Sequence, residues 1–159
     1  ESSAMGVLTS YLRDFYSGAP AADYVAQARQ SDAGFDEAAF QARLDSARNR
    51  TSRPSLPLSG YPGTYRDAWY GDVTLAESQG HLVIRFGRSP AFTGDLEHWH
   101  YDTFRVHWRV ENIPDAWVTF ALEPNGAIGR MTMAAVSPST DFSFDWQDLL
   151  LLPVRERRP

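Results

Sequence analysis

Apolar side chains alternate with polar ones through most of the chain after residue 70, and this period of two constrains the fold more than any other feature. Successive side chains of a β-strand point to opposite faces, so each alternating run predicts a strand with one buried face. The runs lie at Val73–Leu75, Leu82–Phe86, Phe104–Val110, Val118–Leu122, Met131–Met133 and Phe142–Trp146. This part of the chain is therefore expected to be mainly β.

Two short turns connect pairs of these runs. Gln79-Gly80 separates one pair and Pro124-Asn125-Gly126 separates another. Each turn supplies a residue that tolerates positive φ, as a tight hairpin requires, so neighbouring strands should be antiparallel. About eight short strands in meander order, with no helical segment between them, predict a closed up-and-down barrel, which leaves no exposed sheet edge. A two-sheet sandwich is the structural alternative.

The first fifty residues have a helical period and predict three short α-helices before the barrel. The first helix stops at Gly18-Ala19-Pro20, the second runs from about residue 21 to 30, and the third from about 36 to 49. Asp36 and Glu37 suit the positive N-terminal end of the third helix dipole. The apolar face of the first helix consists of Met5, Leu8, Leu12 and Phe15.

Two prolines between Thr51 and Ser59 rule out a regular helix there and predict an extended connector. We expect residues 1–50 to be a helical lead-in from a preceding domain and 51–58 to be a proline-rich linker. Residues 59–154 should form the barrel and 155–159 a solvated tail. The chain begins at Glu1 without an initiator methionine or a signal-peptide pattern, so we expect it to be part of a longer polypeptide.

The composition excludes several functions. The chain has no cysteine, and its 15 basic residues are all arginine. A thiol nucleophile, a thiolate metal site and a Ser-x-x-Lys nucleophile therefore cannot be built from this chain alone. The net charge of -5 argues against a nucleic-acid partner, which needs a surplus of basic side chains. The longest apolar runs, such as Leu149–Val154, are far shorter than the roughly 20 residues of a membrane span.

The segment from Glu97 to Asp102 is acidic, aromatic and rich in histidine. In a strand, His98, His100 and Asp102 would share one face, and with His107 or Asp95 they could bind zinc or iron. The interpretation that we favour is structural, with these histidines bonded to neighbouring strands and no metal bound.

Three carboxylates in this region, those of Asp95, Glu97 and Asp102, could also act as a glycosidase pair, which needs a fixed separation across a cleft. Pairing with arginines such as Arg105 and Arg109, or capping of backbone amides, is the reading that we prefer.

The five tryptophans all follow the proline-rich connector and are expected to fill the core, because each indole buries a large area. An exposed tryptophan would instead mark a surface for a partner. The tryptophans are Trp69, Trp99, Trp108, Trp117 and Trp146.

Four segments in the β-region carry a resemblance to a known family. They are Leu58–Tyr65, Trp69–Val73, Leu96–Phe104 and Phe142–Leu149. In order and spacing they resemble the lipocalin-like domain at the C-terminus of serine hydrolases of the class C β-lactamase and penicillin-binding-protein family. The resemblance implies an auxiliary domain that packs beside a catalytic domain and is associated with oligomer assembly and with access to the active site. The Ser-x-x-Lys and Tyr-x-Asn motifs of that family match no position here, so no catalytic residue is carried over.

These observations predict a noncatalytic accessory domain of a periplasmic or secreted hydrolase, with no cofactor. Its partners would be a catalytic serine hydrolase domain in the same polypeptide and, in addition, other copies of itself in a homo-oligomer. Large aromatics clustered with polar groups are typical of a docking surface. The predicted interaction surface consists of Glu97, His98, Trp99, His100, Tyr101 and Asp102. The alternative is a lipocalin-like module that binds a small hydrophobic ligand in the barrel mouth.

Overall fold

The structure is a computed structural model that describes residues 2–20, 22–32, 35–141 and 143–155. It divides into two compact units, residues 1–45 and residues 46–159. The predicted tail after Arg155 lies outside the described residues, and so does Phe142. The strand predicted from the alternating run that ends at Trp146 is wrong, because Trp146–Asp148 is a short 3-10 helix and the last strand begins only at Leu150.

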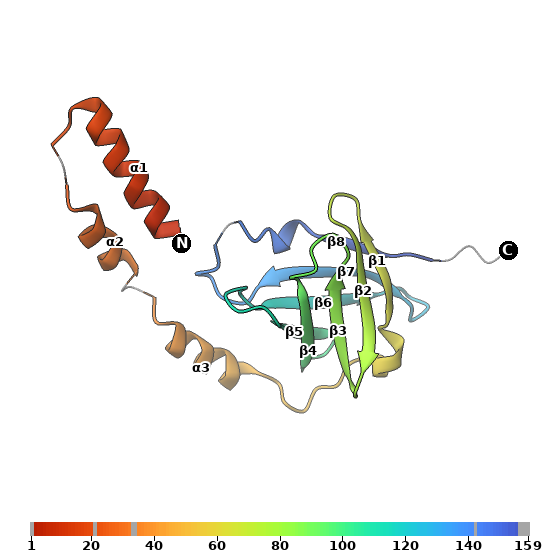
Figure 1. The fold of residues 1–159 in the computed structure, drawn as a ribbon. Coiled ribbons are helices and arrows are strands. Elements are labelled where there is room, and N and C mark those ends of the chain that lie inside the picture. The colour runs from red at the N-terminus through yellow and green to blue at the C-terminus, as the bar shows by residue number, and fades with distance from the viewer. Residues whose placement is uncertain (1, 21, 33–34, 142, 156–159) are drawn as a thin grey trace. The chain divides into compact units, whose positions relative to one another are not determined.

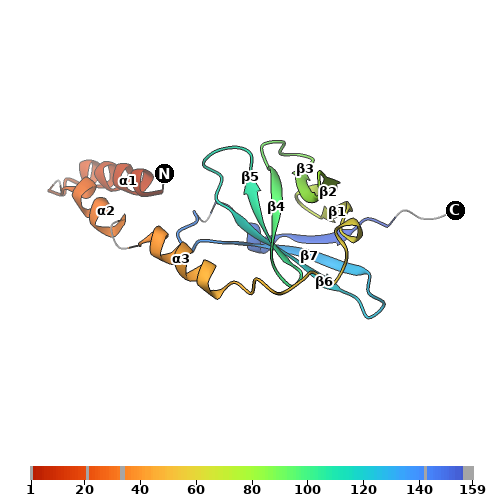
Figure 2. The ribbon, with the colours of Figure 1, turned by 90° about the horizontal axis from the view of Figure 1, so that it is seen from below.

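The second unit is a closed barrel in which every strand pairs with the next and β1 pairs with β8 (Figures 1 and 2). All neighbouring strands are antiparallel. The prediction of an up-and-down barrel is therefore confirmed, and the sandwich alternative is wrong. The strands are β1 Gly63–Asp67, β2 Gly71–Ser78, β3 His81–Phe86, β4 Thr93–His100, β5 Thr103–Trp108, β6 Ala116–Leu122, β7 Ile128–Ala135 and β8 Leu150–Pro153.

Both predicted hairpin turns join the expected strands. Gln79 and Gly80 link β2 to β3 with φ angles of 51° and 81°. Gly126 has a φ of 80° between β6 and β7, where the side chain of Asn125 accepts a hydrogen bond from the amide of Ala127 at 3.0 Å. Glycine adopts this left-handed backbone without a steric penalty, which explains its place in each turn.

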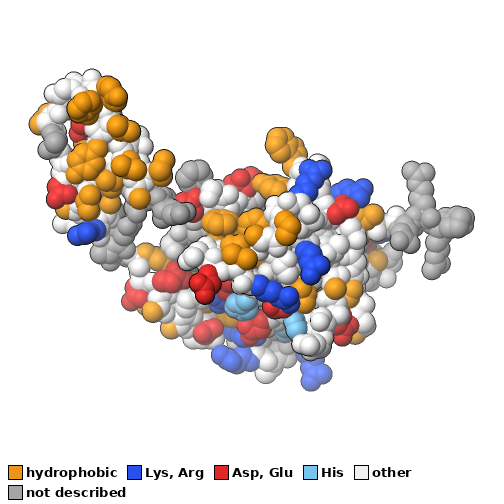
Figure 3. Space-filling model, in the orientation of Figure 1, with side chains coloured by type: hydrophobic (Ala, Val, Ile, Leu, Met, Phe, Trp, Pro, Cys, Tyr) orange, Lys and Arg blue, Asp and Glu red, His pale blue; other side chains and the backbone are white. Residues whose placement is uncertain are grey.

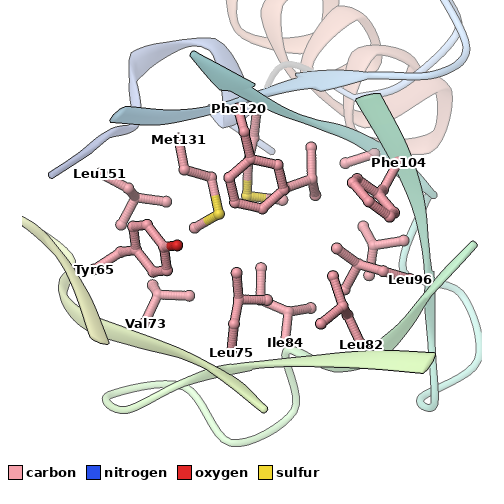
Figure 4. Packing of buried hydrophobic residues seen from close by; sticks show 14 of the residues in the cluster. Tyr65, Val73, Leu75, Leu82, Ile84, Leu96, Phe104, Phe120, Met131 and Leu151 are labelled. Atoms are coloured by element: carbon pink, nitrogen blue, oxygen red, sulfur yellow. The ribbon is translucent and has the colours of Figure 1, made fainter. Parts of the chain in front are cut away.

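The inward face of every strand contributes a buried apolar side chain, and these side chains point into the barrel interior and form the core (Figure 4). Each such burial stabilises the fold by roughly 1.5–3 kcal/mol relative to exposure. Burial also raises the pKa of Tyr65 to about 12. One residue from each strand, in order, is Tyr65, Val73, Ile84, Leu96, Phe104, Phe120, Met131 and Leu151.

The first unit contains most of the helical lead-in, and the structure has helices close to the three expected ranges. Helix α1 (Ser2–Ser17) ends at Gly18, whose φ of 71° breaks the helical backbone. Helices α2 (Tyr24–Asp32) and α3 (Glu37–Ala47) begin after Asp23 and Asp36, and each aspartate accepts a backbone N–H of the first turn at 2.9 Å. Such N-caps satisfy amides that have no partner within the helix. None of the described helices is long and apolar enough to cross a membrane.

Candidate interaction site

The six residues of the predicted interaction surface lie at the end of β4 and in the tight turn to β5. His98 pairs with Phe104 and His100 pairs with Thr103, so Trp99 is left over as a β-bulge. The strand then ends at His100, and Tyr101 adopts a positive φ of 47°. A bulge shifts the alternation of side chains by one position. The expectation that His98, His100 and Asp102 share one face of a strand is therefore wrong.

Trp99 is buried, with 5% of its surface exposed, although it does not belong to the core cluster inside the barrel. Its ring lies 4.9 Å from that of Trp117, measured between centroids. The guanidinium carbon of Arg48 lies 4.6 Å from the centroid of the Trp99 ring. Trp99 is thus packed between a tryptophan of β6 and an arginine that follows α3.

Arg48 binds the bulge through all three nitrogens of its guanidinium. One amino group donates to Glu97 Oε1 at 2.7 Å, the other donates to the carbonyl oxygen of His98, and Nε donates to the carbonyl oxygen of Trp99 at 3.3 Å. Successive carbonyls of a regular strand point to opposite sides, and the bulge disturbs this order, so one planar guanidinium reaches two consecutive carbonyls.

Asp102 makes a second attachment to the same part of the chain. Its carboxylate accepts hydrogen bonds from the amide of Ser55 at 2.9 Å, from the hydroxyl of Ser55 at 2.6 Å and from the hydroxyl of Tyr61 at 2.6 Å. Burial raises the pKa of Asp102, but these hydrogen bonds outweigh it and the net pKa is lowered. Burial, followed by the bond to Asp102, raises the pKa of Tyr61. A charged carboxylate and a neutral phenol are the stable pair.

Smaller contacts lie between these two attachments. The amide of Tyr101 donates to the hydroxyl of Ser52 at 3.2 Å, and the side-chain amide of Asn49 donates to the Tyr101 hydroxyl at 3.3 Å. Five of the six predicted surface residues therefore contact residues 48–61, which we call the connector. For His100 the contact is the ring of Tyr101, at 5.6 Å between centroids.

A charged network continues from Glu97 on β4 to β5 and to Asp115 directly before β6, on a face where acidic, arginine and histidine side chains gather (Figure 3). His107 bonds Asp115 at 2.8 Å through Nδ1 and approaches Glu97 to 3.3 Å through Nε2. Arg105 also binds Asp115, at 2.7 Å. The bond to Asp115, with help from Glu97, raises the pKa of His107.

The three carboxylates considered for glycoside chemistry, those of Asp95, Glu97 and Asp102, are each bound by hydrogen-bond donors. The expectation that these carboxylates pair with arginines such as Arg109 is confirmed for Asp95, which Arg109 binds at 2.7 Å and His81 binds at 2.9 Å. Arg109 lowers the pKa of Asp95 more than any other neighbour. Arg105 pairs with Asp115, which the sequence did not single out. These groups neutralise one another on the surface.

The histidines do not gather around a metal position in the described residues. No group of three or more histidine, aspartate or glutamate side chains in that part of the chain could hold an ion. Nε2 of His98 bonds the carbonyl oxygen of Tyr101 at 2.9 Å. The arrangement that the sequence allowed for zinc or iron is therefore not formed by these side chains.

The family comparison identifies residues 47–152, about two thirds of the chain, as a match to the family described as domain of unknown function DUF3471. The chain belongs to this family. Among solved structures, the C-terminal domain of the penicillin-binding protein Rv0907 is 25% identical, with a TM-score of 0.49. That match covers 67% of this chain and 93% of the other. No curated protein sequence matches the chain.

The DUF3471 segment begins one residue before Arg48, so it contains the whole connector and its binding site on the barrel. Sequence reasoning found the barrel side of this site but missed Arg48 and Ser55, and it treated Tyr61 only as part of a similar segment. Arg48 and Trp99 are 51 residues apart, and no local pattern reveals such a contact. The proline-rich segment before the barrel was the one indirect signal of this site. An extended segment that belongs to neither a helix nor a sheet stays on the barrel only through side-chain contacts.

Proposed function

We propose that this DUF3471 domain is a noncatalytic accessory domain of a serine hydrolase of the class C β-lactamase and penicillin-binding-protein family. It would hold in place the connector that leads to the catalytic domain of the same polypeptide. The resemblance of four sequence segments supports the family of the parent enzyme. We expect the parent enzyme to be periplasmic or secreted.

The observation that carries the proposal is the double attachment of the connector. Arg48 binds the backbone of the bulge and Asp102 binds Ser55 and Tyr61, so both ends of a 14-residue segment are fixed to the β4–β5 hairpin. A connector fixed in this way leaves the barrel at a defined point directly after α3. A freely jointed linker would instead make no fixed contacts with the barrel.

The chemistry of the chain supports a noncatalytic role. With neither lysine nor cysteine in the sequence, the nucleophile and base of the parent family would have to come from elsewhere in the polypeptide. The polar groups at the site serve structure: Asp102 and Glu97 accept bonds from the connector, and His107 bridges two carboxylates.

The geometry gives less support to a small hydrophobic ligand inside the barrel. Apolar side chains from all eight strands point into the interior (Figure 4). The aromatic hollow lined by Tyr70, Phe86 and Trp146 measures about 100 Å³. Pockets for drug-sized ligands are typically at least about 300 Å³. A second hollow, of about 370 Å³, reaches this size, but five of its nine lining residues are polar, namely His81, Asp95, Glu97, His98 and His107.

The test uses the full polypeptide that carries this chain. Its upstream sequence should contain a Ser-x-x-Lys motif, and the 159-residue chain alone should not hydrolyse β-lactams or esters. Steady-state kinetics of the full polypeptide would compare the wild type with Arg48→Ala. Arg53→Ala is the control, because Arg53 is an exposed arginine of the same connector without a hydrogen bond or ion pair in the described residues.

We expect Arg48→Ala to change kcat or KM of the parent enzyme and Arg53→Ala to leave both unchanged. A rise in KM that grows with substrate size would indicate that the domain gates access, whereas a loss of stability of both domains would indicate interdomain contact. Turnover by the isolated chain, abolished by replacing one of its own side chains, would overturn the proposal. So would an upstream sequence without the nucleophile motif.

A further inference from the structure

The most exposed tryptophan of the described residues lies at the turn between β1 and β2. Trp69 has 86% of its surface exposed, whereas Trp99 and Trp146 are buried. Burial of an exposed indole against a partner is strongly favourable, and tryptophan is among the residues that most often dominate binding energy at interfaces.

The turn that carries Trp69 is held by hydrogen bonds from both sides. Asp67, which is 7% exposed, accepts the amides of Trp69 at 2.7 Å and Tyr70 at 2.9 Å with one oxygen. Its other oxygen accepts the amide of Leu150 at 3.0 Å. Arg88 donates to the carbonyl oxygen of Trp69 at 3.0 Å. The backbone is thus organised before any partner binds, which lowers the entropic cost of using this side chain as an anchor.

An aromatic hollow of about 100 Å³ adjoins this turn. Tyr70 and Ser89 line it and directly follow Trp69 and Arg88, so the projecting indole and the hollow are neighbours on the surface. The hollow holds a part of a side chain rather than a drug-sized ligand. The aromatic residues that line it are Tyr70, Phe86, Phe92, Phe144 and Trp146.

The charges beside the indole and the hollow are opposite. Arg88 lies beside Trp69, and Asp145 lines the hollow. Neither side chain forms a salt bridge within the described part of the chain, and Asp72, the carboxylate on which Arg88 acts electrostatically, is bound by Arg66. A partner that fits both features presents a projecting aromatic group with a positive charge and an aromatic hollow with a negative charge. This surface itself has those properties.

We propose that two copies of this chain pair about a two-fold axis through this face, with the edge of each Trp69 indole in the aromatic hollow of the other copy and each Arg88 facing Asp145. A two-fold interface is self-complementary, since each contact occurs twice. Opposite charges at its rim favour this register and oppose others. The pairing goes beyond the proposed function, because it concerns the barrel surface and does not involve the connector.

The first test measures the dimerisation constant of the full 159-residue chain by sedimentation equilibrium. Truncation of a central tryptophan at an interface raises Kd by about thirtyfold or more, so Trp69→Ala should dissociate the dimer at concentrations where the wild type is paired. Phe15→Ala is the matched control, because Phe15 is 79% exposed in the other compact unit. It should leave Kd unchanged. Trp69 is too exposed for its loss to unfold the barrel, which circular dichroism would verify.

The second test exchanges the charges. Arg88→Asp and Asp145→Arg should each weaken the homodimer, because each places like charges opposite one another. Mixing the two variants should restore pairing, since both contacts in the mixed dimer again join opposite charges. A wild type that stays monomeric, a dimer that survives Trp69→Ala, or single variants that do not recover on mixing would each overturn the proposal. Recovery in the mixture distinguishes this interface from pairing through the exposed face of α1.

Discussion

Replacing Arg48 with alanine should release the first part of the connector while the second part stays attached. The substitution removes the bonds to two backbone carbonyls, the ion pair with Glu97 and the contact over the Trp99 ring. The Arg48 side chain is 18% exposed, so its bonds are only partly screened by water. The contact at Ser55 and Tyr61 does not depend on Arg48, because Asp102 makes it.

The magnitude follows from three contributions. The two hydrogen bonds to backbone carbonyls, one of which is long at 3.3 Å, are together assigned about 1.5 kcal/mol, the lower end of the range for one bond from a charged donor. The ion pair with the half-exposed Glu97 adds about 0.5 kcal/mol, and the cation–π contact adds about 1 kcal/mol. Their sum of about 3 kcal/mol corresponds to a population of the open connector that is larger by roughly two orders of magnitude.

Limited trypsin digestion measures the population of molecules with an open connector, because cleavage after Arg50 requires the connector to leave the barrel. When opening is fast relative to cleavage, the rate follows the open population. Cleavage after Arg50 should therefore accelerate by up to roughly a hundredfold in Arg48→Ala. Arg53→Ala should not change it, and proline at position 54 makes residue 53 a poor trypsin site in any case. Equal cleavage rates in Arg48→Ala and the wild type would refute the reasoning.

Three other predictions concern the barrel. Gly94→Ala should lower the free energy of unfolding by about 1–3 kcal/mol in urea titrations, because a Cβ there would lie 2.6 Å from a methyl of Val106 in a packed wall; an unchanged midpoint would contradict this. Asp67→Asn should cost about 2 kcal/mol by thermal denaturation, since a side-chain amide cannot accept hydrogen bonds at both of its ends, and a neutral result would show that the turn does not depend on the carboxylate. The folded-state pKa of Asp102 is lowered from 3.8. Its contribution to the free energy of unfolding should therefore be present above pH 3.8 and be lost as the pH falls through the lower folded-state pKa. The folded-state pKa of His107 is raised from 6.5. Its contribution to the free energy of unfolding should therefore be present below pH 6.5 and be lost as the pH rises through the higher folded-state pKa. The melting temperature should accordingly decline as the pH falls below 3.8 and as it rises above 6.5. His107→Gln should flatten the decline on the alkaline side. A wild type that gains stability above neutral pH would contradict the assignment to His107.

The fold followed from local patterns because the period of two and the turn glycines act over short distances. Gly80 and Gly126 each sit where a hairpin needs a left-handed residue, and neither position depends on distant contacts. The end of the first helix at Gly18 was found in the same way. Closure of the barrel followed from the number of strands and the need to cover both edges.

The sequence predicted only the barrel side of the site, residues 97–102. The other side, which includes Arg48 and Ser55, lies about fifty residues earlier in the chain. The pattern from Glu97 to Asp102 attracted attention as a surface, yet the one-residue bulge at Trp99 cannot be deduced from the identity of the side chains. Once the bulge is present, Trp99 turns toward Arg48 and Trp117. Three-dimensional contacts between residues about fifty positions apart decide this arrangement, and one sequence does not display them.

The seam of the barrel also determines how the domain can be connected. β1 and β8 lie side by side with Tyr65 opposite Pro153, and the amide of Val154 donates to the carbonyl oxygen of Thr64 at 2.8 Å. The polypeptide therefore enters and leaves the barrel at the same rim. A domain with adjacent ends tolerates insertion into a loop of another protein or circular permutation. The barrel can therefore be inserted as a unit into different proteins during evolution. A circular permutant with its new termini at the Gln79-Gly80 hairpin would leave every strand intact.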